Sequence, residues 1–287
     1  MGTELKMRGV EVPSHVESIW SALALTENTS VIKEIHLDYI NAGAEFIIAN
    51  NYAVTQPILK RANLLDQLEE LTLKSIQIAK EAIQESGKDI LLAASLPPLE
   101  TSYRSDLILE TASMDKMYQE LASILENNVD IIICETMSHS REARSALASI
   151  QESKSQKWIG WTLYGNQNTL PSGETITEAF NFISDLKCDA YLINCGGANL
   201  ITEGIKELKS LTNERIGGYG NSEKIEISHE DRSDRPEEDH WASATPINEK
   251  EYAKEAQIWV EEGASIVAGC CRTRPSHIAE IVKTFSV

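Results

Sequence analysis

The chain has 287 residues, 42% of them hydrophobic, which is enough to bury the core of one large domain or two ordinary ones. Its formal net charge of -18 and its isoelectric point near 4.8 argue against nucleic acid as a partner, because phosphate binding needs clustered lysine and arginine. No apolar stretch approaches the roughly 20 residues of a membrane span, and the opening MGTELKMRG lacks the apolar core of a signal peptide, so we expect a cytoplasmic protein that binds no membrane.

Short apolar runs rich in β-branched residues recur along the chain, and segments with helical periodicity follow them. Such runs are typical of strands that are buried on both faces, and their alternation with helices predicts a parallel sheet covered by helices. We expect seven strands, which lie within the runs 45–49, 89–95, 129–134, 157–163, 189–194, 215–218 and 264–268.

Apolar residues three to five positions apart predict one-sided helices between these strands, within 64–83, 114–124 and 252–259. Gly43 and Gly263 stand just ahead of two strands and fit helix ends that are capped by glycine. The alternation and the length predict an α/β fold of the (β/α)8 TIM-barrel type, with its first strand missing or truncated at the N-terminus. An open doubly wound sheet is the alternative, but no glycine-rich phosphate loop follows an early strand.

We expect residues 1–287 to form a single barrel domain. Only one shift in composition stands out, the long acidic segment Asn221–Pro246. We interpret it as an elaborated loop over the mouth of the barrel and not as a linker between domains.

Cysteines stand at the carboxyl ends of two predicted strands, where barrels of this type build their active sites. Cys195 follows one strand and the adjacent Cys270 and Cys271 follow another, after Gly269, which permits a tight bend. Three thiolates would leave a tetrahedral zinc ion one open position, as in catalytic zinc sites. Widely separated ligands are a less specific signal than a CxxC pair, so buried packing is the alternative for these cysteines.

The remaining cysteines, Cys134 and Cys188, are interpreted as core packing, because single buried cysteines usually are. A disulfide between Cys270 and Cys271 is disfavoured in a reducing compartment. The sequence does not indicate an oligomeric state.

Several segments together resemble the homocysteine S-methyltransferase family, and the resemblance runs over nearly the whole chain in the family's order. They include HLDYINAGAEFIIANNY, AASLPPLETSYRSDL, CETMSHSREA, LPSGETITEAF, LINCGG and VAGCCRTRPSHI. The resemblance implies a (β/α)8 barrel with a zinc ion held by one cysteine after strand six and a cysteine pair after strand eight. Those positions match Cys195, Cys270 and Cys271, which would be both the metal ligands and, through zinc, the catalytic residues.

Two further positions match family residues that bind substrate. Glu135, in CETM, matches the glutamate that holds the substrate's amino group, and its alternative is an acid favoured by a helix N-terminus. Asn50 falls on the family's Thr-Asn-Thr segment, where its amide could line the pocket. A plain turn residue is an equal alternative.

The chain departs from the family at its beginning. Family members carry an apolar first strand that ends in Asp-Gly-Gly directly before Met-Gly-Thr-Glu-Leu, and here Met1 is that methionine. We therefore expect the native protein to start upstream, with the missing strand supplying an aspartate near the substrate amino group. Another segment or a partner filling the gap is the alternative.

The resemblance implies zinc-dependent methyl transfer to the thiolate of homocysteine, which gives methionine. S-methylmethionine is the expected donor, with S-adenosylmethionine and betaine as alternatives, so the expected partners are small molecules. A non-catalytic relative that binds zinc or thiols is a second interpretation. A barrel enzyme of other chemistry with structural cysteines is a third.

Overall fold

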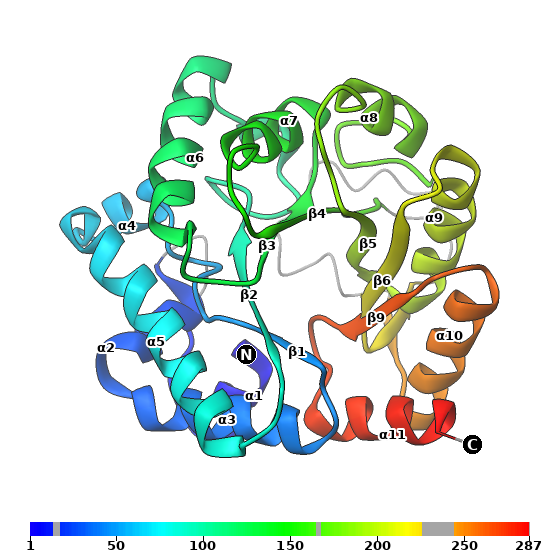
Figure 1. The fold of residues 1–287 in the computed structure, drawn as a ribbon, viewed down its shortest axis with the longest axis horizontal. Helices are drawn as coiled ribbons and strands as arrows, with labels where there is room; N and C mark the ends of the chain where they lie inside the picture. Colours follow the sequence, from blue (N-terminus) through cyan, green and yellow to red (C-terminus); the bar gives the residue numbers. More distant parts are fainter. Residues whose placement is uncertain (14–17, 165–167, 226–243, 287) are drawn as a thin grey trace.

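The computed structural model describes residues 1–13, 18–164, 168–225 and 244–286. Its centre is a curled sheet of seven parallel strands in the order β1-β2-β3-β4-β5-β6-β9 (Figure 1). All seven predicted strands are confirmed, and their bounds are β1 Phe46–Ile48, β2 Leu91–Leu96, β3 Ile131–Met137, β4 Gln156–Trp161, β5 Ala190–Gly197, β6 Arg215–Asn221 and β9 Ile266–Gly269.

Helices form a ring around the outside of the curled sheet (Figure 1). The longer ones are α3 Thr29–Asn41, α5 Leu68–Ser86, α6 Thr111–Leu125, α7 Ser140–Ser149, α8 Ile176–Phe182, α9 Ala198–Leu211, α10 Glu249–Glu261 and α11 Pro275–Phe285. The short ones are α1 Gly2–Met7, α2 Ala24–Glu27 and α4 Gln56–Arg61, with 3-10 turns η1 Trp20–Leu23, η2 Leu65–Gln67 and η3 Ser105–Leu107.

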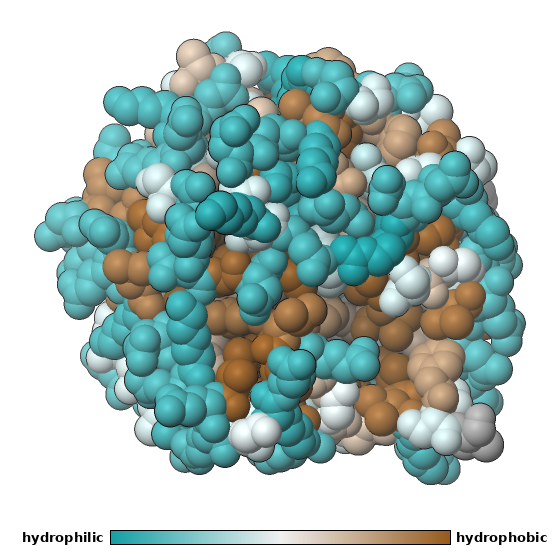
Figure 2. Space-filling model, in the orientation of Figure 1, coloured by the Kyte–Doolittle hydropathy of each residue, from teal (hydrophilic) through white to brown (hydrophobic). Residues whose placement is uncertain are grey.

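The strands are buried on both faces, as their composition predicted. Residues that alternate along a strand point to opposite faces, and β3 shows this directly. Ile131 and Ile133 pack inside the curl with Trp158, while Ile132 and Cys134 pack outside against the helices. Figure 2 shows a largely hydrophilic rim on this face of the molecule, with hydrophobic residues nearer the middle of the view.

The predicted glycine caps are confirmed at two helix ends. Gly43 follows α3 with a φ of +100°, and Gly263 follows α10 with a φ of +111°. Both angles lie in the region that glycine adopts without the steric penalty of a Cβ atom. Each cap turns the chain directly into the next strand, β1 or β9.

The edges of the sheet are β1, which pairs with β2, and β9, which pairs with β6. The fold shown is therefore an α/β fold with a curled seven-stranded parallel sheet. A strand that would be the first of an eight-stranded barrel, which the sequence indicated as missing or truncated, has no counterpart in the part of the chain that the structure describes. No described helix is both long and apolar enough to cross a membrane.

The acidic segment begins and ends in a small antiparallel ribbon that the sequence did not predict. The ribbon pairs β7 Glu223–Ile225 with β8 Ala244–Pro246. The predicted acidic loop between them, residues 226–243, lies outside the described residues.

Candidate active site

Three cysteine sulfurs from two distant parts of the chain meet at the carboxyl ends of the strands. Cys195 lies in β5, and Cys270 and Cys271 directly follow β9. The Sγ atom of Cys195 lies 3.0 Å from that of Cys270 and 3.9 Å from that of Cys271. All three sulfurs lie within 4.8 Å of one another. The convergence that the sequence predicted is therefore present in the fold.

A β-bulge in β5 aims Cys195 at this point. The register between β5 and β6 shifts after Asn194, so that Cys195 and Gly196 together oppose Gly220 alone. Cys195 itself has a φ of +59°, which is uncommon for a residue other than glycine. Bulges re-aim side chains next to active sites, and this one redirects a residue that regular pleating would place differently.

Gly269 is important for the cysteine pair because it has no side chain, and not because of an unusual backbone angle. Its φ lies outside the left-handed region, so the bend expected from glycine freedom is not what requires it. A Cβ atom on Gly269 would lie 2.4 Å from the Oγ1 atom of Thr273. That hydroxyl donates a 2.7 Å hydrogen bond to the carbonyl of Cys270. The missing side chain therefore lets Thr273 fold back and hold the turn that carries both sulfurs.

We call the sulfurs of Cys195, Cys270 and Cys271 the sulfur group. Two polar side chains that the sequence interpretation missed hold this group in place. The side-chain NH2 of Asn221 donates to the carbonyl of Cys195 over 3.3 Å, and its oxygen accepts from the backbone N–H of Cys271 over 3.0 Å. Asn221 thus ties both cysteine-bearing segments together. The hydroxyl of Tyr103 lies 2.9 Å from the sulfur of Cys195 and 3.1 Å from its carbonyl oxygen.

Crowding makes the sulfur group resist ionisation. Hydrogen bonds with Cys195 and Cys271, together with burial, raise the pKa of the Cys270 thiol well above its usual range. Like charges this close disfavour one another in a buried site. A cation beside the three sulfurs would therefore favour their thiolate forms.

Glu135 lies in a second bulge, in β3, where Glu135 and Thr136 oppose Gly160 of β4. Its side chain is buried, and both of its oxygens are engaged. Oε1 accepts a hydrogen bond from Ser95, and Oε2 accepts one from the hydroxyl of Tyr219 over 2.9 Å. Burial raises the pKa of Glu135, while these two hydrogen bonds oppose that rise. The carboxylate is thus fixed in position by donors from β2 and β6.

Asn50 faces a different neighbour. It follows β1, is 3% exposed, and accepts a 2.8 Å hydrogen bond from the hydroxyl of Ser21. Its NH2 group donates to the carbonyl of the same serine over 2.9 Å. The amide therefore joins the loop after β1 to the η1 turn, and its predicted place in the substrate pocket stays a prediction.

The other two cysteines lie outside the sulfur group. Cys134 is fully buried among the helices, and the thiol of Cys188 donates to the carbonyls of Ala190 and Lys157 over 3.1 and 3.4 Å. Burial raises the pKa of Cys188 to about 12. Such groups are inert at neutral pH, in keeping with packing.

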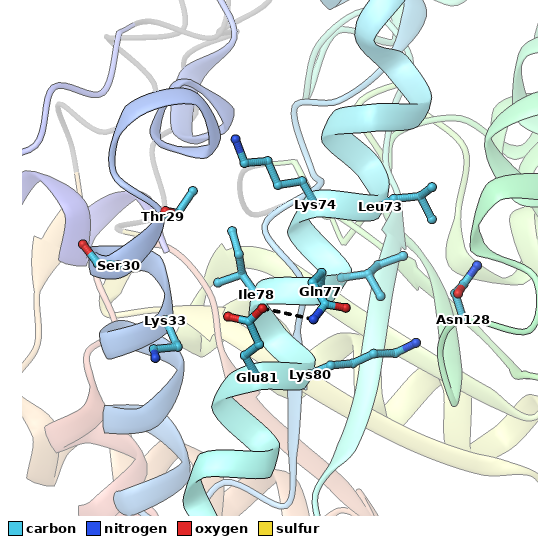
Figure 3. A pocket seen from close by; sticks show the side chains of 11 residues that line it. Thr29, Ser30, Lys33, Leu73, Lys74, Gln77, Ile78, Lys80, Glu81 and Asn128 are labelled. Atoms are coloured by element: carbon cyan, nitrogen blue, oxygen red, sulfur yellow. Dashed lines mark hydrogen bonds between the residues drawn. The ribbon is translucent and has the colours of Figure 1, made fainter.

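A groove on the outer surface lies between α3 and α5 and shares no residue with this site (Figure 3). Its lining includes Lys33 and Lys74, together with Gln77 and Glu81, which are joined by a 3.0 Å hydrogen bond. Lys33 and Lys74 are half-buried helix residues, and Lys33 pairs with Glu85 at 2.9 Å. The groove adds nothing to the chemistry of the strand ends.

Comparison with known proteins agrees with the geometry. The homocysteine S-methyltransferase family profile matches residues 1–285. Homocysteine S-methyltransferase 1 of Arabidopsis thaliana is 27% identical over an alignment 303 residues long, gaps included, which covers 97% of this chain and 89% of the relative. Homocysteine S-methyltransferase YbgG of Bacillus subtilis is 27% identical over an alignment 301 residues long, gaps included, which covers 98% of this chain and 91% of the relative.

The same fold occurs in a solved structure, the metallated form of the homocysteine methyltransferase MmuM from Escherichia coli. The two superpose with a TM-score of 0.82 at 24% identity, over 99% of this chain and 93% of that one. At this identity the structural likeness shows the fold alone. The family is shown by the family profile, which covers nearly every residue of the sequence. The chain therefore belongs to the homocysteine S-methyltransferase family.

Proposed function

We propose that this chain transfers a methyl group from S-methylmethionine to the sulfur of homocysteine, and that Cys195, Cys270 and Cys271 hold a zinc ion for that reaction. The observation that carries the proposal is the meeting of the three sulfurs within 4.8 Å of one another. Methyl transfer to homocysteine is the activity after which the family is named.

The donor set fits zinc. Tetrahedral zinc with Zn–S bonds of about 2.3 Å places its sulfur ligands about 3.8 Å apart. The separation between Cys195 and Cys271 is 3.9 Å, and that between Cys195 and Cys270 is shorter, at 3.0 Å. No described histidine or carboxylate joins the three sulfurs as a fourth ligand. A zinc ion held by three thiolates keeps one position for a substrate sulfur and favours its thiolate form at neutral pH.

Glu135 would orient the amino acid part of the substrate. Its carboxylate is already fixed by Ser95 and Tyr219, so it needs little reorganisation when an ammonium group arrives. A carboxylate that meets an ammonium in a largely dry site forms a charge-assisted hydrogen bond. Together with the cysteine site, this contact would hold homocysteine at both of its ends.

The transfer is a single displacement. The homocysteine sulfur forms a bond to the methyl carbon while the bond between that carbon and the donor sulfonium breaks. The thiol proton leaves to water when homocysteine binds. The donor sulfonium becomes a neutral thioether, so S-methylmethionine and homocysteine each end as methionine. Holding acceptor and donor in line supplies much of the acceleration.

The architecture proposed for the whole domain is the (β/α)8 barrel over residues 1–287. The curl of the seven parallel strands and the outer ring of helices support it, since one further strand between β1 and β9 would close the barrel. A cytosolic location, where thiols stay reduced, suits a site built from three cysteine thiols.

Two measurements test the proposal together. Metal analysis of the purified protein is expected to give about one zinc ion per chain. Labelled homocysteine with S-methylmethionine, S-adenosylmethionine or betaine is expected to yield methionine fastest with the first donor. Zinc binding without turnover by any donor would support the non-catalytic alternative. A chain without metal that leaves homocysteine unchanged would support an unrelated chemistry.

A further inference from the structure

The side chain of Asn194 in β5 reaches across β4 and grips Thr136 in β3. Its oxygen accepts a 2.9 Å hydrogen bond from the backbone N–H of Thr136, and its NH2 group donates to the Thr136 hydroxyl over 2.8 Å. Both residues are fully buried. We name this pair of hydrogen bonds, between Asn194 and Thr136, the clamp. Buried bonds of this kind hold their partners firmly, because breaking one leaves an unsatisfied group.

The clamp exists because β4 has glycine at the crossing point. A Cβ atom on Gly160 would lie 2.7 Å from the Oδ1 atom of Asn194 and 3.3 Å from the hydroxyl of Tyr219. The first distance is shorter than real contacts allow. If position 160 held any residue other than glycine, the side chain of Asn194 could not keep its place. Gly160 therefore leaves room for the clamp and for the tyrosine that donates to Glu135.

Each end of the clamp adjoins one of the two bulges. Thr136 directly follows Glu135 in the β3 bulge, and Asn194 directly precedes Cys195 in the β5 bulge. Thr136 has a φ of +60°, which is unfavourable for a β-branched residue, and Cys195 has a φ of +59°. Strained residues of this kind persist only where their surroundings hold them. The clamp joins the two strained segments directly.

We propose that the clamp sets the separation between the Glu135 carboxylate and the cysteine sulfurs, and that this separation selects the acceptor by the length of its carbon chain. The inference rests on the proposed function, in which the substrate's amino group meets Glu135 and its sulfur meets the cysteine site. Homocysteine has one methylene more than cysteine between these two groups. With both anchors fixed, cysteine cannot satisfy both. Asn194 and Thr136 thus act as positioning residues and touch no substrate.

The test uses paired changes at the two ends of the clamp. Thr136→Val keeps the shape of the side chain but removes the hydroxyl, and Thr136→Ser is the matched control that keeps it. Thr136 also interacts with Tyr52, so Asn194→Ala breaks the clamp independently from its other end. Affinities of the metal-loaded variants for homocysteine and for cysteine are measured by calorimetric titration, alongside metal content and thermal unfolding.

We expect Thr136→Val, which removes one of the two buried hydrogen bonds of the clamp, to reduce the ratio of homocysteine to cysteine affinity about tenfold. Asn194→Ala removes both bonds and is expected to reduce the ratio at least as much. Thr136→Ser is expected to keep the wild-type ratio, and metal content is expected to stay the same in all three. A folded, metal-loaded Thr136→Val protein with the wild-type ratio would overturn the inference, even if it unfolds at a lower temperature. A wild-type protein that does not prefer homocysteine would overturn it as well. Because binding is the readout, a failure to form methionine would count against the proposed function alone.

Discussion

The guanidinium of Arg272 lies 2.5 Å from the carboxylate of Glu223, whose side chain is fully buried. Arg272 directly follows the cysteine pair and has a φ of +62°. The other oxygen of Glu223 accepts from the NH2 group of Asn221 over 3.2 Å, and Asn221 in turn bonds to the backbone of Cys271. The ion pair therefore anchors the turn that presents two of the three sulfurs.

Arg272→Ala is expected to cost about 3 kcal/mol of unfolding free energy, because it leaves a buried carboxylate without its cation. Burial raises the pKa of Glu223 to about 7, although Arg272 and Asn221 lower it, so the measurement belongs at pH 8, where the carboxylate is ionised. Urea unfolding of Arg272→Ala is compared with that of the double variant Arg272→Ala with Glu223→Gln. The double variant should recover most of the loss, and equal losses in both would contradict the role given to the ion pair.

Cys270→Ser is expected to abolish tight metal binding, since two sulfurs and a hydroxyl make a poor site for zinc. Cys188→Ser is the matched control, because its thiol bonds to the backbone carbonyls of Lys157 and Ala190, away from the three sulfurs. Elemental analysis after dialysis gives the metal content of each protein. Full retention of metal by the Cys270 variant would show that the three sulfurs are not the ligands.

Glu135→Gln is expected to raise the KM for homocysteine by about 10- to 100-fold, the range for losing a hydrogen bond between charged groups. Zinc content should not change, because Glu135 is not among the three residues that are proposed to bind the ion. Glu142→Gln serves as a control that removes another buried carboxylate, on α7. An unchanged KM would argue that Glu135 has a structural role only.

Glu142 gives the protein a measurable dependence of stability on pH. Burial raises its pKa to about 7 from 4.5, although hydrogen bonds from Leu99 and Tyr118 lower it. A raised pKa in the folded state means a contribution to stability that is full below pH 4.5 and is lost as the pH rises through 7. Glu142→Gln has no such titrating group. Between pH 4 and 8 the free energy of unfolding of the wild type should therefore fall by on the order of 3 kcal/mol more than that of the variant. Denaturant titrations at both pH values measure the difference, and parallel behaviour of the two proteins would refute it.

Hydrophobic pattern was sufficient to predict the seven strands and the helices α5, α6 and α10. Runs such as 129–134 are apolar on both faces, and burial between an inner core and the helices requires that pattern. The position of Cys195 and Cys270 at strand ends was also readable, because carboxyl ends of parallel strands meet at one edge of the sheet. What remained open was whether the sulfurs meet, and the geometry shows that they do.

The fine positioning of the site could not be predicted from local sequence. The bulges at Glu135 and Cys195 are defined by the register with neighbouring strands, which no short segment encodes. Asn194 ends an apolar run and Asn221 begins the acidic segment, and their partners lie 58 and 50 positions away in the chain. Only the pairing of the strands across the sheet reveals what they hold.

Cys195 and Cys270 are separated by 75 positions, and Cys270 directly follows β9, which pairs only with β6 among the described strands. During synthesis, the emerging polypeptide offers a single one of the three sulfurs until its last strand has been made. An ion that needs all three must therefore be captured late, after this strand docks. Its binding would then join the end of the last-made strand to β5, where Cys195 lies.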